Sequence, residues 1–128
     1  MKKENRFYCI MVFMMLFINL VSALHADLII SEYVEGSSYN KAIELHNPGT
    51  IDLDLETENY VMEMYFNGNT TPGITINLTG TIHAGDVFVL AHEQVDGTIF
   101  PVGEVDQYGA GGWFNGDDTI VLKRNGPT

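Results

Sequence analysis

The chain has 128 residues, enough for one domain, and carries six Lys and Arg against 17 Asp and Glu, a formal net charge of −11. A surface that grips nucleic acid needs clustered Lys and Arg to neutralise phosphates, so we expect no direct nucleic-acid binding. The single cysteine, Cys9, lies in an apolar run near the start. The rest of the chain therefore has no disulfide and no thiol chemistry.

The chain opens with the three-part layout of a secretory signal peptide. A basic start over residues 1–6 precedes an apolar stretch over 7–20, and small residues follow. We expect cleavage after Ala23 or Ala26 and prefer Ala26, because a strand begins directly after it. The alternative is an uncleaved anchor, but the stretch is at the short end of the roughly 20 residues that span a bilayer. The sequence thus predicts a secreted, extracellular protein with no stable membrane span after cleavage.

Residues 27–128 are predicted to form the mature domain. This part keeps three basic residues against 16 acidic ones, a net charge of −13. Such acidity suits solubility, or divalent cations, in a salty exterior. Without a disulfide, the stability of the domain has to come from packing.

Short β-like runs separated by turn residues follow one another through the domain. Seven are predicted as strands, at residues 27–34, 41–46, 60–66, 74–78, 87–92, 96–100 (the weakest) and 118–124. The continuous apolar run at 87–91 predicts a strand buried on both faces. Residues 106–113 are predicted to form a glycine-rich loop. The even spacing of short strands and glycine turns indicates an all-β, antiparallel sandwich or barrel.

The end of the chain carries a strong hairpin signal, Asn125-Gly126, with no second strand after it. We therefore expect the domain to be truncated at Thr128, before its closing strand or strands. The alternative is a frayed native tail.

Three blocks of the sequence resemble successive parts of a lamin tail domain, in its secreted bacterial form. They contain a strand that ends at an Asn (residues 43–47), a Gly-Asp turn before a buried strand (85–91), and a Gly followed by two acids before a late strand (116–122). The resemblance covers about residues 27–126. It implies an immunoglobulin-like β-sandwich used for attachment. Because such bacterial modules often accompany catalytic domains, it also implies the N-terminal part of an extracellular nuclease or phosphatase-type enzyme whose catalytic domain follows this chain.

The stretch "GWFNGDD" contains two adjacent carboxylates, Asp117 and Asp118. We expect them to begin a strand, where neighbouring side chains point to opposite faces and cannot easily share an ion or a proton. The favoured interpretation is therefore structural, with Trp113 and Phe114 covering one end of the core. Calcium binding shared with an acid from another loop, and catalysis, remain the alternatives.

A second polar cluster contains Glu32, Glu35, Ser37, Ser38, Asn40 and Lys41. It is predicted either as a recognition loop or as a strand connection whose side chains cap backbone groups. If Glu35 lay near Asp117, the two would offer oxygen ligands for Ca²⁺. The histidines have no zinc-type spacing.

These features predict a non-catalytic binding module with no catalytic residue and no required cofactor, calcium being left open. Its partner is expected to be a protein, a glycan or a cell-surface ligand. The alternatives are a small metal-dependent hydrolase that uses Asp117, Asp118 and Glu35, and a calcium-stabilised structural spacer.

Overall fold

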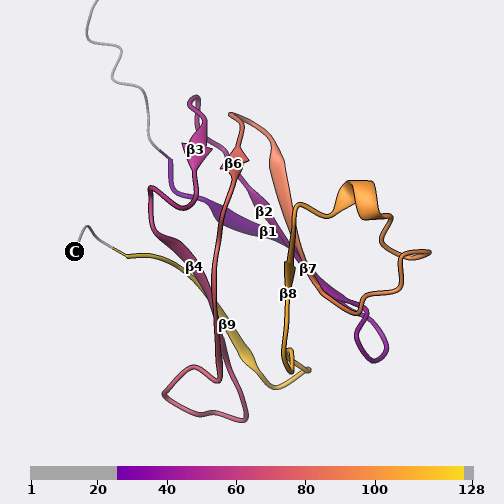
Figure 1. Ribbon diagram of the computed structural model, residues 1–128. Coiled ribbons are helices and arrows are strands. Elements are labelled where there is room, and N and C mark those ends of the chain that lie inside the picture. Colours follow the sequence, from indigo (N-terminus) through magenta and orange to yellow (C-terminus); the bar gives the residue numbers. More distant parts are fainter. Residues whose placement is uncertain (1–25, 126–128) are drawn as a thin grey trace, which may run out of the picture.

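The structure of the protein is a computed structural model that describes residues 26–125 (Figure 1). The predicted signal peptide therefore lies, except for Ala26, outside the described residues. Within them the chain forms nine β-strands and one short 3-10 helix, so the predicted all-β fold is confirmed. The same residues contain no helix long and apolar enough to cross a membrane.

The strands form two main sheets and a small pair. The first sheet has the order β1-β2-β7-β8, and the second has the order β5-β4-β9. The bounds of the first are β1 (Ile29–Glu35), β2 (Lys41–His46), β7 (Val87–His92) and β8 (Gln107–Gly109). Those of the second are β4 (Tyr60–Tyr65), β5 (Ile74–Asn77) and β9 (Thr119–Arg124). The small pair is β3 (Leu53–Asp54) with β6 (Thr81–Ile82), and η1 spans Val102–Glu104.

The core lies between the two main sheets and follows the alternation in the sequence. Ile43 and Leu45 of β2 face Met62 and Met64 of β4 across it, and the exposed fraction of all four side chains is 0%. Successive residues of a strand point to opposite faces, so each strand contributes every second residue. Full burial of such a side chain stabilises the fold by about 1.5–3 kcal/mol. The buried residues of β2 and β4 therefore follow the period of two expected for strands with one face in the core.

Strand β7 is less buried than predicted, because Val87 at its start is 43% exposed. The neighbouring strand β8 pairs only with Leu90, Ala91 and His92 at the end of β7. The first half of β7 therefore pairs with a strand on one edge only, and on the other edge Asp106 bonds to the backbone of Val89.

The predicted weak strand at residues 96–100 is wrong, since these residues form a turn. The carboxylate of Asp96 accepts the backbone N–H of Thr98, and the backbone carbonyl of Asp96 accepts the N–H groups of Ile99 and Phe100. Asx-type bonds of this kind compete with strand pairing. These hydrogen bonds of Asp96 therefore favour a turn over the strand that Thr98, Ile99 and Phe100 would favour by composition.

The predicted glycine-rich loop instead contains β8, which pairs with β7 in parallel, the one departure from an antiparallel sandwich among the described strands. Parallel pairing needs a crossover of about a dozen residues or more, and residues 93–106 provide it. Gly109 is required for close packing: a Cβ there would lie 2.7 Å from Ile76 and 2.9 Å from Trp113.

Asn47, directly after β2, is a buried polar residue with an exposed fraction of 0%. Its side-chain amide donates to the carbonyl oxygens of Ile51, Ile82 and His83 at 2.8, 3.2 and 3.2 Å. Its side-chain oxygen accepts the N–H of Gly49 at 2.9 Å. Asn47 therefore joins the end of β2 to the segment between β6 and β7.

Candidate functional site

The two adjacent acids of "GWFNGDD" lie in a turn rather than in a strand, because β9 begins only at Thr119. The Asp118 carboxylate accepts two backbone N–H groups, that of Asn67 through Oδ1 and that of Asn115 through Oδ2, both at 2.8 Å. It therefore links its own turn to the turn after β4. Asp117 is exposed.

Glu35 lies beside this turn, an arrangement that the sequence alone did not predict. A Cβ on Gly116 would be 3.9 Å from the Oε2 atom of Glu35. The Glu35 carboxylate accepts the Tyr33 hydroxyl at 2.7 Å and pairs with the Lys41 ammonium at 3.7 Å. Partial burial, this hydrogen bond and the negative charges of Glu35 and Asp118 raise the pKa of Tyr33 to about 12.

The loop between β1 and β2 is a tight turn. The N–H of Gly36 donates to the carbonyl of Asn40 at 2.7 Å, and a Cβ on Gly36 would lie 2.5 Å from that oxygen, so only glycine fits. Ser37 and Ser38 are exposed, and Ser38 has a φ of 56°. The Asn40 side-chain oxygen accepts the N–H of Asp96 at 2.9 Å, which ties this loop to the turn after β7.

A shared metal site was one alternative for Glu35, Asp117 and Asp118. Within residues 26–125, no group of three or more His, Cys, Asp or Glu side chains is placed to hold a metal ion. Asp118 and Glu35 instead bind backbone N–H groups and neighbouring side chains.

A row of aromatic rings runs from Tyr33 in β1 to Tyr39 in the loop between β1 and β2. Tyr33 contacts Phe114, Phe114 contacts Trp113, Trp113 contacts His92, and His92 stacks on Tyr39. The four centroid distances are 4.6, 5.7, 5.5 and 4.6 Å. Trp113 and Phe114 are buried, as expected for residues that cover an end of the core, whereas Tyr39 is 49% exposed.

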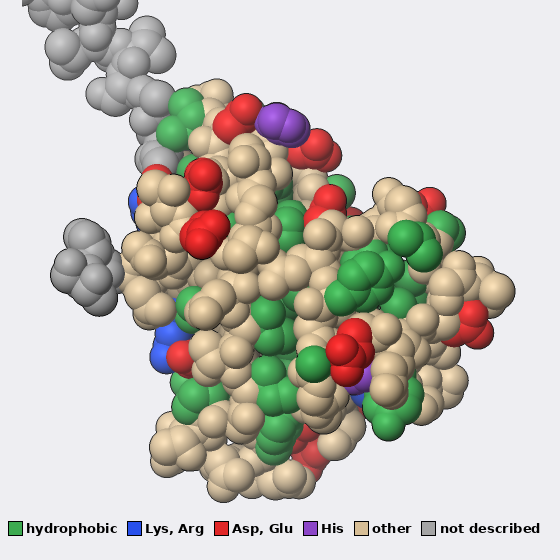
Figure 2. All heavy atoms as spheres, in the orientation of Figure 1, with side chains coloured by type: hydrophobic (Ala, Val, Ile, Leu, Met, Phe, Trp, Pro, Cys, Tyr) green, Lys and Arg blue, Asp and Glu red, His purple; other side chains and the backbone are tan. Residues whose placement is uncertain are grey.

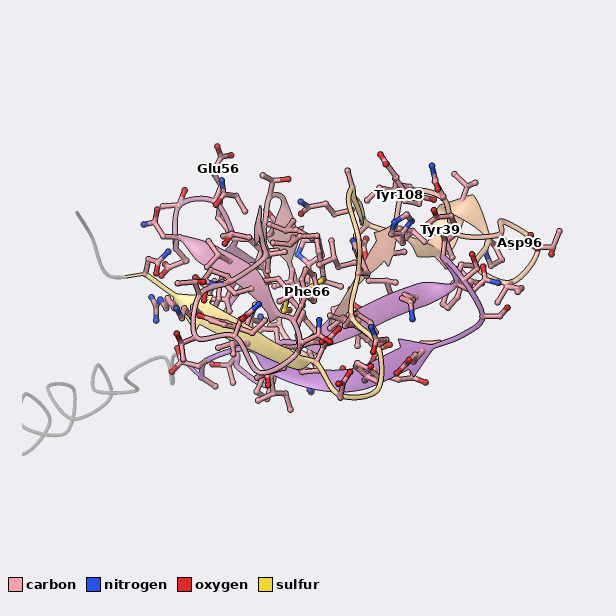
Figure 3. All side chains as sticks on the ribbon, turned by 90° about the horizontal axis from the view of Figure 1, so that it is seen from below. Tyr39, Glu56, Phe66, Asp96 and Tyr108 are labelled. Carbon is pink, nitrogen blue, oxygen red and sulfur yellow. The ribbon has the colours of Figure 1, made fainter. Side chains whose placement is uncertain are left out.

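A hollow of about 280 Å³ opens at the exposed end of this row. It is lined by Tyr39, His92, Glu93, Gln94, Gly111 and Gly112. Figure 3 shows Tyr39 at the end of the molecule that also carries Asp96, with Glu56 at the other end.

His92 forms the floor of the hollow and is only 2% exposed. Its Nδ1 accepts the backbone N–H of Gln94 at 2.9 Å, and its Nε2 lies 2.8 Å from the carbonyl of Gly111. Since a backbone N–H can only donate, Nε2 carries the ring hydrogen and donates it to Gly111. His92 is therefore a capped strand-end residue that orients its ring under Tyr39.

No local pattern in the sequence marks this hollow. The polar residues of the loop between β1 and β2 stand out as candidates, whereas Tyr39 among them does not. The hollow combines residues from three loops that are far apart in the chain, and no local motif marks such a set. The glycines at 111 and 112 are the one signal, because they leave room for a cavity wall without side chains.

The three basic side chains of the described part are each paired with acids. Lys41 pairs with Glu35, Lys123 with Glu63 at 2.6 Å, and Arg124 with Glu58 and Asp27.

The Nδ1 atom of His83 and the Asp52 carboxylate lie 2.8 Å apart on the surface, a hydrogen bond that becomes an ion pair when the imidazole is protonated. The hydrogen bond between them raises the pKa of His83 and lowers that of Asp52. His83 is therefore a surface residue whose ring is held by Asp52.

Two facing sheets of short, mainly antiparallel strands around one apolar core define an immunoglobulin-like β-sandwich. The family model of the lamin tail domain matches residues 22–128. The chain therefore belongs to the lamin tail domain family, as the blocks of sequence resemblance predicted. No curated protein and no solved structure matches the chain. The immunoglobulin-like fold of the family agrees with a non-catalytic module.

Proposed function

We propose that the chain is the non-catalytic attachment module of a secreted protein, the N-terminal part of an extracellular nuclease or phosphatase-type enzyme. The module holds the enzyme at a protein, glycan or cell-surface ligand, and the chemistry belongs to a separate catalytic domain. The basic start and apolar stretch within residues 1–26 support secretion.

The observation that carries this proposal is how the acids are used. The Asp118 carboxylate binds two backbone N–H groups, and the Glu35 carboxylate binds Tyr33 and Lys41. A general base or metal ligand has to offer its oxygens to the substrate or the ion. These two carboxylates instead support the turn and the strand that carry them.

The charge of the domain also supports attachment without nucleic-acid binding. Residues 27–128 have a net charge of −13, and Lys41, Lys123 and Arg124 are engaged by acids. Phosphate contacts that release counterions need available Lys and Arg. Recognition of DNA is thus left to another part of the secreted protein.

A phosphodiesterase assay of the purified protein, with and without a chelator, tests this function. We expect no hydrolysis above the buffer control in either condition. Hydrolysis that the chelator removes, and that falls in Glu35→Gln or Asp118→Asn, would establish the hydrolase instead. A catalytically inactive domain of unrelated fold serves as the control for contaminating nuclease.

A further inference from the structure

The hollow beside Tyr39 has the chemistry of a cation site. Glu93 is one of its lining residues, and within residues 26–125 no ion pair or hydrogen bond engages the Glu93 carboxylate. The Tyr39 ring packs against His92 and remains 49% exposed, which leaves part of the ring accessible to a ligand. A cation placed over an aromatic ring and beside a carboxylate is attracted by both.

The connection that leads away from the hollow carries charges of one sign. The connection from β7 to β8, residues 93–106, carries Glu93, Asp96, Glu104 and Asp106 and no Lys or Arg. Figure 2 shows acidic side chains among hydrophobic ones on the side where this connection lies, and Lys and Arg mainly at the opposite edge. Electrostatic complementarity of this kind favours a basic partner and steers it toward the surface.

The shape of the hollow suits a single long side chain. A volume of about 280 Å³ is near the lower limit of sites that hold small molecules, and one wall is the bare backbone of Gly111 and Gly112. An Arg guanidinium is planar, stacks on aromatic faces and binds carboxylates through two N–H groups. Lys can make the charge contact without the flat stacking.

We propose that this hollow binds a basic side chain, preferably Arg, of a protein partner. The side chain lies against Tyr39 and pairs with Glu93, and the acidic connection attracts the basic segment that carries it. The proposal rests on the attachment function and names its partner as a basic protein segment. It does not involve Asp117, Asp118 or the phosphodiesterase test.

Titration calorimetry of the purified protein with short peptides tests the proposal. The probes are acetyl-Gly-Arg-Gly-amide and its citrulline analogue, which has the same shape without the charge. We expect the Arg peptide to bind and the citrulline peptide to bind at least about fivefold more weakly, since charge–ring attraction requires the cation. Fluorescence of Trp113, the single Trp of the chain, provides a second readout, because its ring contacts His92.

Matched variants locate the binding. Gly112→Leu adds a bulky side chain at a residue that lines the hollow, and a Cβ at Gly112 meets no atom within 4 Å, so the fold should tolerate it. Gly103→Leu, on η1, is the same change in equally open space and serves as the control. We expect Gly112→Leu to abolish binding and Gly103→Leu to leave it within about twofold.

The two contacts are tested separately. Tyr39→Leu and Glu93→Gln should each weaken binding of the Arg peptide by about fivefold or more. Glu56→Gln removes the same charge at the opposite end of the molecule (Figure 3) and should have little effect. If Tyr39→Leu lowered the melting temperature, Gly112→Leu and Glu93→Gln would still decide the outcome.

Three results would overturn the inference. Equal binding of the Arg and citrulline peptides would remove the role of charge. Equal loss in Gly112→Leu and Gly103→Leu, or in Glu93→Gln and Glu56→Gln, would indicate general attraction to an acidic protein. Binding of a neutral tetrasaccharide that Gly112→Leu abolishes, without Arg binding, would assign the hollow to a glycan. Glycan binding would still agree with the proposed attachment function, whereas chelator-sensitive hydrolysis would contradict that function.

Discussion

Replacing Asn47 by Ala is expected to destabilise the domain by about 3 kcal/mol. The change leaves the carbonyl oxygens of Ile51, Ile82 and His83 without the amide that they share, and the N–H of Gly49 without its acceptor. Unmet buried polar groups cost far more than an exposed hydrogen bond contributes. For a domain of about 100 residues we expect the melting temperature to fall by roughly 12–20 °C.

Two further variants identify the cause of this loss. Asn47→Asp keeps the size and the acceptor but turns a carboxylate toward carbonyl oxygens, so it should destabilise at least as much as Asn47→Ala. Asn69→Ala removes an exposed amide from the turn after β4 and should change stability by less than about 0.5 kcal/mol. A stable Asn47→Asp variant would contradict the assigned donor role of the amide.

Replacing Phe114 by Ala should destabilise the domain by about 3–5 kcal/mol. The ring is 0% exposed and contacts Tyr33 on one side and Trp113 on the other, with the Lys41 ammonium 5.4 Å from its centroid. Its removal leaves a cavity between the edge strand β1 and the end of the core. Because the total stability of such a domain is about 5–15 kcal/mol, much of it would be lost.

Chemical unfolding of Phe114→Ala, with Tyr108→Ala as the control, measures this effect. Tyr108 is also aromatic but is 41% exposed on the outside of β8, so its truncation should cost little. Phe114→Leu should recover most of the stability, since it retains much of the buried volume. A loss in Phe114→Ala as small as that in Tyr108→Ala would show that the Phe114 ring does not contribute to the core.

The sequence was sufficient for the parts of the fold that depend on alternation. Ile43, Leu45, Met62 and Met64 are placed inward by a period of two, and the structure confirms them. The turn at 96–100 and the strand β8 were not predictable in this way. The first depends on side-chain bonds from Asp96, and the second on contacts of Gly109 with residues far along the chain.

The candidate site was predictable only in part, for the same reason. The structural role of the acids was inferred from their adjacency, although Asp117 and Asp118 lie in a turn and not in the strand that the inference used. The place of Glu35 beside that turn depends on how the hairpin of β1 and β2 packs. The hollow at Tyr39 depends on the meeting of three loops, which no local pattern encodes.

A melting experiment on Asp117→Ala and Asp118→Ala, each with calcium and with a chelator, decides whether the acidic turn is structural or a ligand site. Asp118→Ala loses two backbone hydrogen bonds and should lower stability by about 1–2 kcal/mol in both conditions. Asp117→Ala should have almost no effect, and calcium should not shift any of the curves. Stabilisation of the parent protein by calcium, lost equally in both variants, would instead make the two carboxylates metal ligands and contradict the structural role assigned to Asp118.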